Sequence, residues 1–136
     1  MKKNNGILVL FMILLWSGIT HASDTLDYVE VLDNLSLSKQ TSLHVEMYWQ
    51  KIRDSQVTWK GVVQNVKGGR GKAEIYVANP DAMTYKGYNL ILISYDLEAA
   101  AGLKVGDSIS FSGRLQKYTG KKGRPVVITL IEAQVH

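Results

Sequence analysis

The chain has 136 residues, a formal net charge of +4 at pH 7 and no cysteine. The lack of cysteine excludes disulfide bonds, thiolate metal ligands and a cysteine nucleophile. The length is sufficient for one domain whose core needs neither a metal nor a disulfide.

The first 22 residues have the pattern of a secretory signal peptide. Lys2 and Lys3 precede an apolar run over residues 7–16, and Thr20-His21-Ala22 supplies a small-residue cleavage site. The apolar run is about ten residues long, whereas a membrane-spanning helix needs roughly 20. We therefore expect cleavage near Ala22, and a mature chain that has no transmembrane segment and is periplasmic or secreted.

After the signal peptide we expect an acidic N-terminal arm, residues 23–41, followed by the main domain, residues 42–136. The arm mixes acidic with apolar residues, which indicates either a short helix or a frayed segment. The apolar side chains of residues 45–52 recur at the spacing of one helical face. The main domain is therefore predicted to begin with a helix, for which Ser42 is the expected N-cap.

Beyond this helix, apolar and polar residues alternate with the period of a β-strand. Five strands are predicted, around residues 57–64, 73–77, 88–94, 109–116 and 125–135. A short helix over residues 96–102 separates the third strand from the fourth, and Gly61 and Gly113 mark bends. Trp59 falls on the inward phase of the first strand and is expected in the core. The order of elements is that of a five-stranded OB-fold, a Greek-key barrel, which we favour over an open sandwich. The predicted fold class is all-β with short helices, preceded by an N-terminal helix.

Three segments also resemble a known family. They are VTWKGVV at residues 57–63, LKVGD at residues 103–107 with the following Ile109, Phe111 and Gly113, and the closing strand over residues 126–135. These segments are similar to exported bacterial OB-fold proteins grouped as tRNA-anticodon-binding-like, over roughly residues 45–135. The shared motifs concern barrel closure, so the resemblance implies the fold and carries no chemistry.

The basic residues are concentrated towards the C-terminus, where eleven of the sixteen follow residue 54. OB-folds that bind oligonucleotides or oligosaccharides use one barrel face and the loops between strands 1 and 2 and between strands 4 and 5. Both of these predicted loops are basic, and tyrosines on or beside the strands could stack on a ligand. The candidate ligand-binding residues are Lys60, Lys67, Arg70, Lys72, Tyr76, Arg114, Lys117, Tyr118, Lys121, Lys122 and Arg124.

Two functions are compatible with this pattern. The first is a binding module for an anionic polymer, either single-stranded nucleic acid or an anionic glycan, held by the two basic loops. The second is a protein-interaction subunit of a cell-envelope assembly, which would receive a partner in the groove or at a free barrel edge. The sequence alone leaves both open.

Enzymatic activity is not expected. Asp81 and Asp107 are turn residues and Asp96 is a helix cap, so no pair of carboxylates is arranged for acid–base work. After removal of the signal peptide only His44 and His136 remain as histidines, too few for a histidine metal site. We therefore predict no catalytic residue, no metal and no cofactor.

Overall fold

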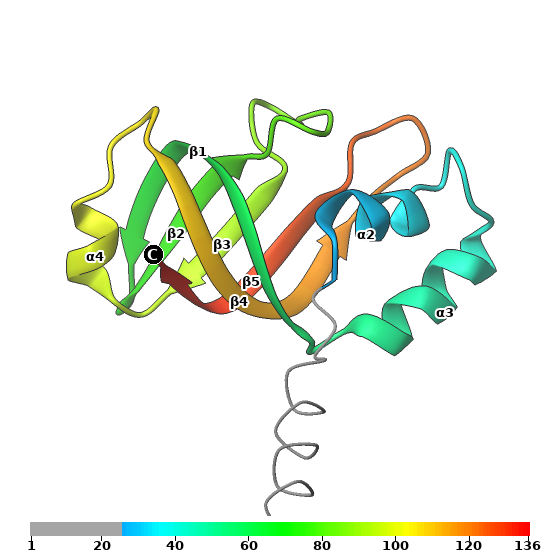
Figure 1. The fold of residues 1–136 in the computed structure, drawn as a ribbon, viewed down its shortest axis with the longest axis horizontal. Coiled ribbons are helices and arrows are strands. Elements are labelled where there is room, and N and C mark those ends of the chain that lie inside the picture. The colour runs from blue at the N-terminus through cyan, green and yellow to red at the C-terminus, as the bar shows by residue number, and fades with distance from the viewer. Residues whose placement is uncertain (1–25) are drawn as a thin grey trace, which may run out of the picture.

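The computed structural model describes residues 26–136, so the predicted signal peptide and the start of the arm lie outside the described residues. Five strands close into a barrel in the order β1-β2-β3-β5-β4 (Figure 1). The predicted OB-fold barrel is thereby confirmed. The strands are β1 (Gln56–Gly69), β2 (Lys72–Ala78), β3 (Leu90–Ser94), β4 (Ser108–Thr119) and β5 (Val127–Val135).

The long strand β1 belongs to two parts of the barrel. Its first half pairs with β4 and its second half with β2, and the change of partner occurs at Val62. The preceding Gly61 allows this, because a Cβ at that position would collide with the side chain of the buried Val77. At Gly113 on β4 a Cβ would lie 3.0 Å from the Cβ of Leu130 on β5. At both predicted bends, therefore, the backbone of the glycine lies close to a side chain of a neighbouring strand.

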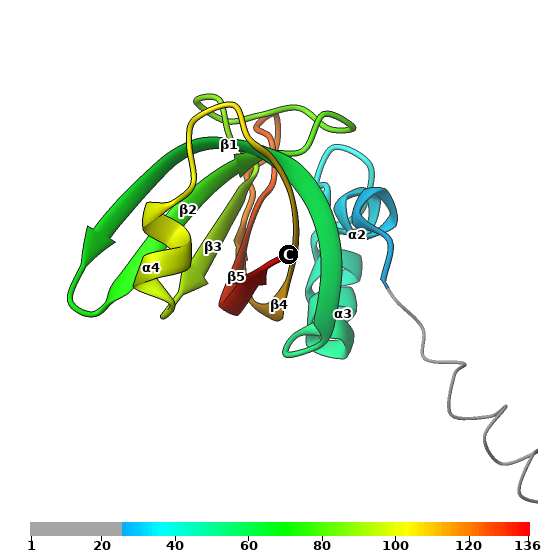
Figure 2. The ribbon, with the colours of Figure 1, turned by 60° about the vertical axis from the view of Figure 1, so that its left-hand side comes forward.

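Within residues 26–136, three helices accompany the barrel: α2 (Tyr28–Leu35), α3 (Ser42–Ile52) and α4 (Leu97–Ala101). Helix α4 joins β3 to β4 and is capped by Asp96, as predicted. The N-cap of α3 is Thr41, whose hydroxyl accepts a hydrogen bond from the His44 amide. The prediction that Ser42 caps this helix is therefore wrong. Figure 2 shows α4 on one side of the barrel and the pair α2 and α3 on the other. None of the helices within residues 26–136 has the length and apolar character needed to cross a membrane.

The acidic arm contributes to the core. Tyr28, Val31 and Leu35 of α2 are buried in the same cluster as the barrel interior. Trp59 of β1 is also buried, as predicted, and its indole N–H donates to the carbonyl of Leu26 at 2.8 Å. The Tyr28 ring meets the Trp59 ring edge-on, with centroids 5.1 Å apart. Of the two alternatives for the arm, the helix is therefore correct, and it is fixed to the barrel through Trp59.

The third strand begins at Leu90, two residues later than predicted, because a pair of buried asparagines closes the preceding loop. The Asn79 amide donates to Asn89 Oδ1 at 2.7 Å, and Asn89 Nδ2 donates back to the Asn79 carbonyl at 2.9 Å. Asn79 Nδ2 also donates to the carbonyl of Lys60. This network fixes the β2–β3 loop, residues 79–89, on the barrel.

Candidate ligand-binding face

Three tyrosines form a continuous row on the outside of β2 and its following loop. The ring centroids of Tyr76 and Tyr88 lie 4.9 Å apart and those of Tyr88 and Tyr85 lie 6.3 Å apart, both edge-on. A lysine ammonium group lies over each end of the row: Lys67 Nζ is 5.1 Å from the Tyr76 centroid and Lys86 Nζ is 5.3 Å from the Tyr85 centroid. We call these five residues the tyrosine track.

The local sequence explains how the track is built. Strand alternation turns Tyr76 outward while its neighbours Ile75 and Val77 are buried. Tyr85 and Tyr88 exchange two backbone hydrogen bonds, of 2.7 and 3.2 Å, across a two-residue turn. That turn is Lys86-Gly87, and both residues have positive φ, as a type I′ hairpin requires. Opposite residues of a hairpin share a face, so this small turn presents two tyrosines together.

A carboxylate lies beside the first tyrosine. The Tyr76 hydroxyl donates to Glu74 Oε2 at 2.8 Å. This hydrogen bond, with a smaller contribution from burial, raises the pKa of Tyr76 to about 12. Glu74 and Tyr76 share one face of β2, so the carboxylate orients the phenol within the track.

The two basic loops lie at opposite ends of the barrel. Strand β5 runs parallel to β3, so the β4–β5 loop that precedes β5 lies at the same end of the barrel as the β2–β3 loop that precedes β3. The β1–β2 turn lies at the other end, where β2 begins. Arg70 is in the first loop and is exposed, as are Lys121, Lys122 and Arg124 in the second.

The tyrosine track connects these two loops. At one end, Lys67 lies directly opposite Glu74 on the paired strands β1 and β2, next to the turn that carries Arg70. Lys72 begins β2 just after that turn. At the other end, Tyr85 shares a shallow hollow of about 170 Å³ with Lys121 and Arg124. A ligand that follows the track would meet cations at both ends.

Four of the predicted ligand-binding residues lie away from the track. The guanidinium group of Arg114 donates to Asp54 at 2.9 Å and to Glu132 at 3.1 Å. Tyr118 is half-buried, and its ring centroid is 4.9 Å from that of Trp49 on α3.

Both carboxylate partners of Arg114 have left-handed backbone conformations, with φ of 67° at Asp54 and 54° at Glu132.

The other two predicted ligand-binding residues that lie away from the track are cations. Lys60 is exposed where β1 changes partner, and Lys117 is exposed on β4.

Sequence reasoning missed Tyr85, Lys86 and Tyr88. It assigned Tyr88 to the third strand and gave no role to Tyr85 or Lys86. The available signal was the stretch Tyr85-Lys86-Gly87-Tyr88, in which two aromatic residues flank a central pair that ends in glycine. Such a pair favours a two-residue hairpin, which would have placed both rings on one face.

No family model, curated protein or solved structure matches the chain. The resemblance to the exported OB-fold family therefore stays a prediction. Within residues 26–136, no three side chains of His, Asp or Glu gather as a metal site would require.

Proposed function

We propose that this protein is a non-enzymatic, exported binding module that holds an anionic polymer, single-stranded nucleic acid or an anionic glycan, along the tyrosine track. The observation that carries the proposal is the row of three tyrosines between two basic loops. Aromatic rings accept bases or sugar rings by stacking, and each base stacked contributes about 1 to 3 kcal/mol. Cations at both ends attract the charges of the polymer backbone.

The size of the face suits a polymer better than a small ligand. Strand β2 has seven residues, which at about 3.3 Å per residue extend over roughly 20 Å. The basic loops add to this length at each end. OB-folds bind roughly 4 to 16 nucleotides of a single strand each, and this face is of the corresponding size.

The choice between nucleic acid and glycan depends on where the protein acts. OB-folds bind both classes through the same face. Export, which the sequence predicts from residues outside the described part of the chain, would bring the protein to anionic glycans of the cell envelope and to little nucleic acid. Mass spectrometry of the exported protein tests this premise, with a terminus near Ser23 as the expected result and an intact Met1 as the contradicting one.

A salt titration tests the binding proposal. The probes are a fluorescent single-stranded oligonucleotide and, separately, fluorescent heparin. Each phosphate neutralised contributes about −0.7 to the slope of log affinity against log salt, so about four contacts predict a slope near −3. Lys121→Glu with Lys122→Glu removes two contacts and should reduce the slope to about −1.5.

Lys51→Glu with Arg53→Glu is the matched control, because it changes the net charge equally at exposed positions at the end of α3. It should weaken binding less and leave the slope near −3. Surface substitutions of this kind usually change stability by less than about 0.5 kcal/mol, so thermal unfolding should hardly move for the loop variant. Equal affinities and slopes for wild type and the loop variant would show that these lysines do not touch the ligand.

A further inference from the structure

The hollow at the end of the tyrosine track continues into a larger groove. The groove has a volume of about 460 Å³ and lies between α2, the β2–β3 loop and the β4–β5 loop (Figure 1). Arg124 and Pro125 line both this groove and the hollow beside Tyr85. The track, the hollow and the groove therefore form one continuous surface, and Arg124 lies at the border between the last two.

The groove has an aliphatic lining that reaches the solvent. Apolar side chains come from α2 and from both loops, namely Val29, Leu32, Ala82, Met83 and Val126. Met83 is 79% exposed and Val29 is 39% exposed. A concave, partly apolar surface of this size is typical of a ligand-binding site.

Four charged residues line the groove, and two of them already pair with each other. Lys39 Nζ lies 2.7 Å from Asp33 Oδ1. The other two are Asp81 and Arg124, which are both exposed and form no salt bridge within residues 26–136. The groove thus offers an unpaired cation at its border with the track and an unpaired carboxylate that lines the groove alone.

We propose that this groove binds the continuation of an anionic glycan held on the tyrosine track, so that α2 completes the ligand-binding surface. This inference rests on the proposed polymer binding, because Arg124 would bind an acidic group of the same polymer where it passes from the hollow into the groove. The C–H face of a sugar ring would pack on the aliphatic lining. Its hydroxyl groups would donate hydrogen bonds to Asp81 and exchange them with Ser36 and Ser38.

A single-stranded nucleic acid fits the groove less well. It carries a phosphate on every unit, which the unpaired carboxylate of Asp81 would repel. The described lining of the groove also contains no aromatic ring on which a base could stack. A glycan whose acidic sugars alternate with uncharged ones can place an uncharged sugar at Asp81. The charge and the lining of the groove therefore favour a glycan.

Hyaluronan tests the proposal, because its acidic sugars alternate with uncharged ones. A fluorescent tetrasaccharide is short enough to occupy the track alone, whereas a decasaccharide can also reach the groove. The added contacts should make the decasaccharide bind wild type about tenfold more tightly than the tetrasaccharide.

Met83→Glu places a second carboxylate in the groove. It should weaken decasaccharide binding about fivefold and change tetrasaccharide binding less than about twofold. Met47→Glu is the matched control, because Met47 lies on α3, is 64% exposed and undergoes the same change of charge. It should affect the two probes alike, and both variants should fold, since neither side chain is buried.

Asp81→Asn distinguishes a glycan from a nucleic acid. It should weaken decasaccharide binding about threefold, because a neutral amide accepts weaker hydrogen bonds from hydroxyl groups than a carboxylate does. The same variant should bind a single-stranded oligonucleotide more tightly, since a repulsive charge is removed.

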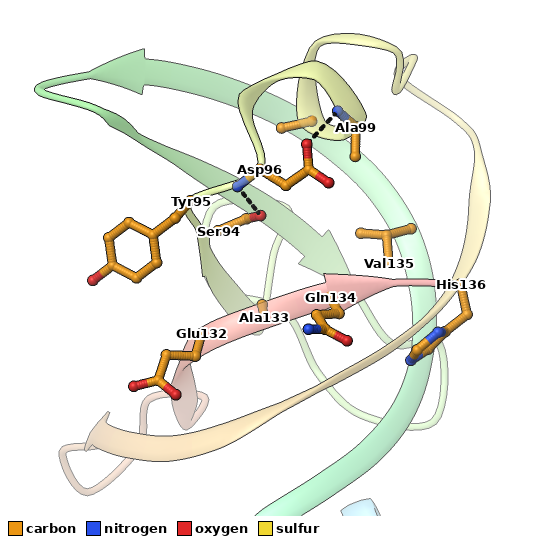
Figure 3. A pocket seen from close by; sticks show the side chains of 10 residues that line it. Ser94, Tyr95, Asp96, Ala99, Glu132, Ala133, Gln134, Val135 and His136 are labelled. Carbon is orange, nitrogen blue, oxygen red and sulfur yellow. Dashed lines mark hydrogen bonds between the residues drawn. The ribbon is translucent and has the colours of Figure 1, made fainter.

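Asp96→Asn is the matched control for this variant. Asp96 is exposed and lines a separate cavity of about 340 Å³ between β5 and the start of α4, where it accepts the Ala99 amide (Figure 3). That cavity shares no lining residue with the groove. Asparagine is also a good N-cap, so the variant should fold and should bind both hyaluronan probes as wild type does.

The methionine methyl groups report contact with the groove without any variant. Met1 and Met12 lie in the predicted signal peptide, so Met47 and Met83 are the two methionines of the mature chain. In nuclear magnetic resonance spectra of the mature protein with isotope-labelled methionine methyl groups, the decasaccharide should shift the Met83 signal and the tetrasaccharide should not. The Met47 signal should stay in place with both.

The possible failures separate this inference from the proposed function. If both oligosaccharides bind but Met83→Glu weakens them equally, or the decasaccharide leaves the Met83 signal unchanged, the groove is not part of the binding surface. If the Met83 signal shifts with the oligonucleotide and not with the decasaccharide, the groove belongs to a nucleic acid and the glycan assignment is wrong. If wild type binds neither oligosaccharide nor the oligonucleotide, the proposed function itself fails, and this inference with it.

Discussion

The outer faces of β2 and β4 carry the same kind of residues but differ in what surrounds them. Each has a tyrosine on or beside the strand and nearby cations, Tyr76 with Lys67 on one side and Tyr118 with Arg114 on the other. On the β2 face the lysine lies over the ring, and further tyrosines extend the row. On the β4 face the arginine is bound by two carboxylates and the tyrosine packs on Trp49.

The difference shows that an outward strand position is not by itself a free position. Strand alternation places Tyr76 and Arg114 outside the barrel, and does so equally for both. Whether such a residue can meet a ligand depends on neighbours from distant parts of the chain. Helix α3 brings Trp49 onto Tyr118, and Asp54 and Glu132 neutralise Arg114.

The largest effect is expected on stability, for an aromatic ring that is buried in the barrel core. Trp59→Ala should lower the free energy of unfolding by about 3 to 5 kcal/mol, because it removes a buried indole, its hydrogen bond to Leu26 and its contact with Tyr28. Denaturant unfolding measures this. Tyr76→Leu, at the half-buried track position, should cost far less, and similar losses for the two variants would contradict the division between core and surface aromatics.

The next effect concerns ligand binding and compares the two faces directly. Tyr85→Leu should weaken binding of a labelled single-stranded oligonucleotide about 5- to 150-fold, the equivalent of losing one stacked base. Tyr118→Leu is the control, since leucine keeps an apolar contact with Trp49 and the ring is not part of the track. Fluorescence anisotropy measures both. Equal losses would place Tyr118 in the binding surface as well.

A smaller effect is expected in the alkaline titration of Tyr76. Its pKa is raised to about 12 by the hydrogen bond to Glu74, so Glu74→Gln should move the pKa down towards the ordinary value of about 10. The neutral phenol is the favoured form in the folded protein. The stability that the Tyr76–Glu74 hydrogen bond contributes is therefore fully present below pH 10, and it is lost as the pH rises towards 12.

An ultraviolet difference titration of wild type against Glu74→Gln isolates this group from the other tyrosines. An unchanged titration would mean that the Tyr76 hydroxyl and Glu74 are not hydrogen-bonded in solution.

The smallest effect is expected at Arg114. Arg114→Gln should change oligonucleotide affinity less than twofold at fixed salt, because Asp54 and Glu132 already bind the guanidinium group. Lys67→Gln, which removes a cation from the track, should weaken binding more and reduce the salt dependence. If Arg114→Gln had the larger effect, the β4 face would belong to the ligand-binding surface despite its ion pairs.

Much of the fold follows from local patterns in the sequence. Alternation over residues 57–64 and 109–116 predicts strands with the correct inward residues, including Trp59. The sequence Asp96 to Gly102 predicts α4 with its cap. These features depend on a few consecutive residues, whose steric and hydrogen-bonding preferences act without help from distant parts of the chain.

The tertiary structure decided which surface residues act together. Tyr85 and Tyr88 reach Tyr76 because Asn79 and Asn89 fix the loop between β2 and β3. Arg114 is neutralised because β5 and the end of α3 bring carboxylates to it from 18 and 60 residues away along the chain. Such neighbours are set by strand register and loop closure over long sequence separations, and local preferences do not encode them.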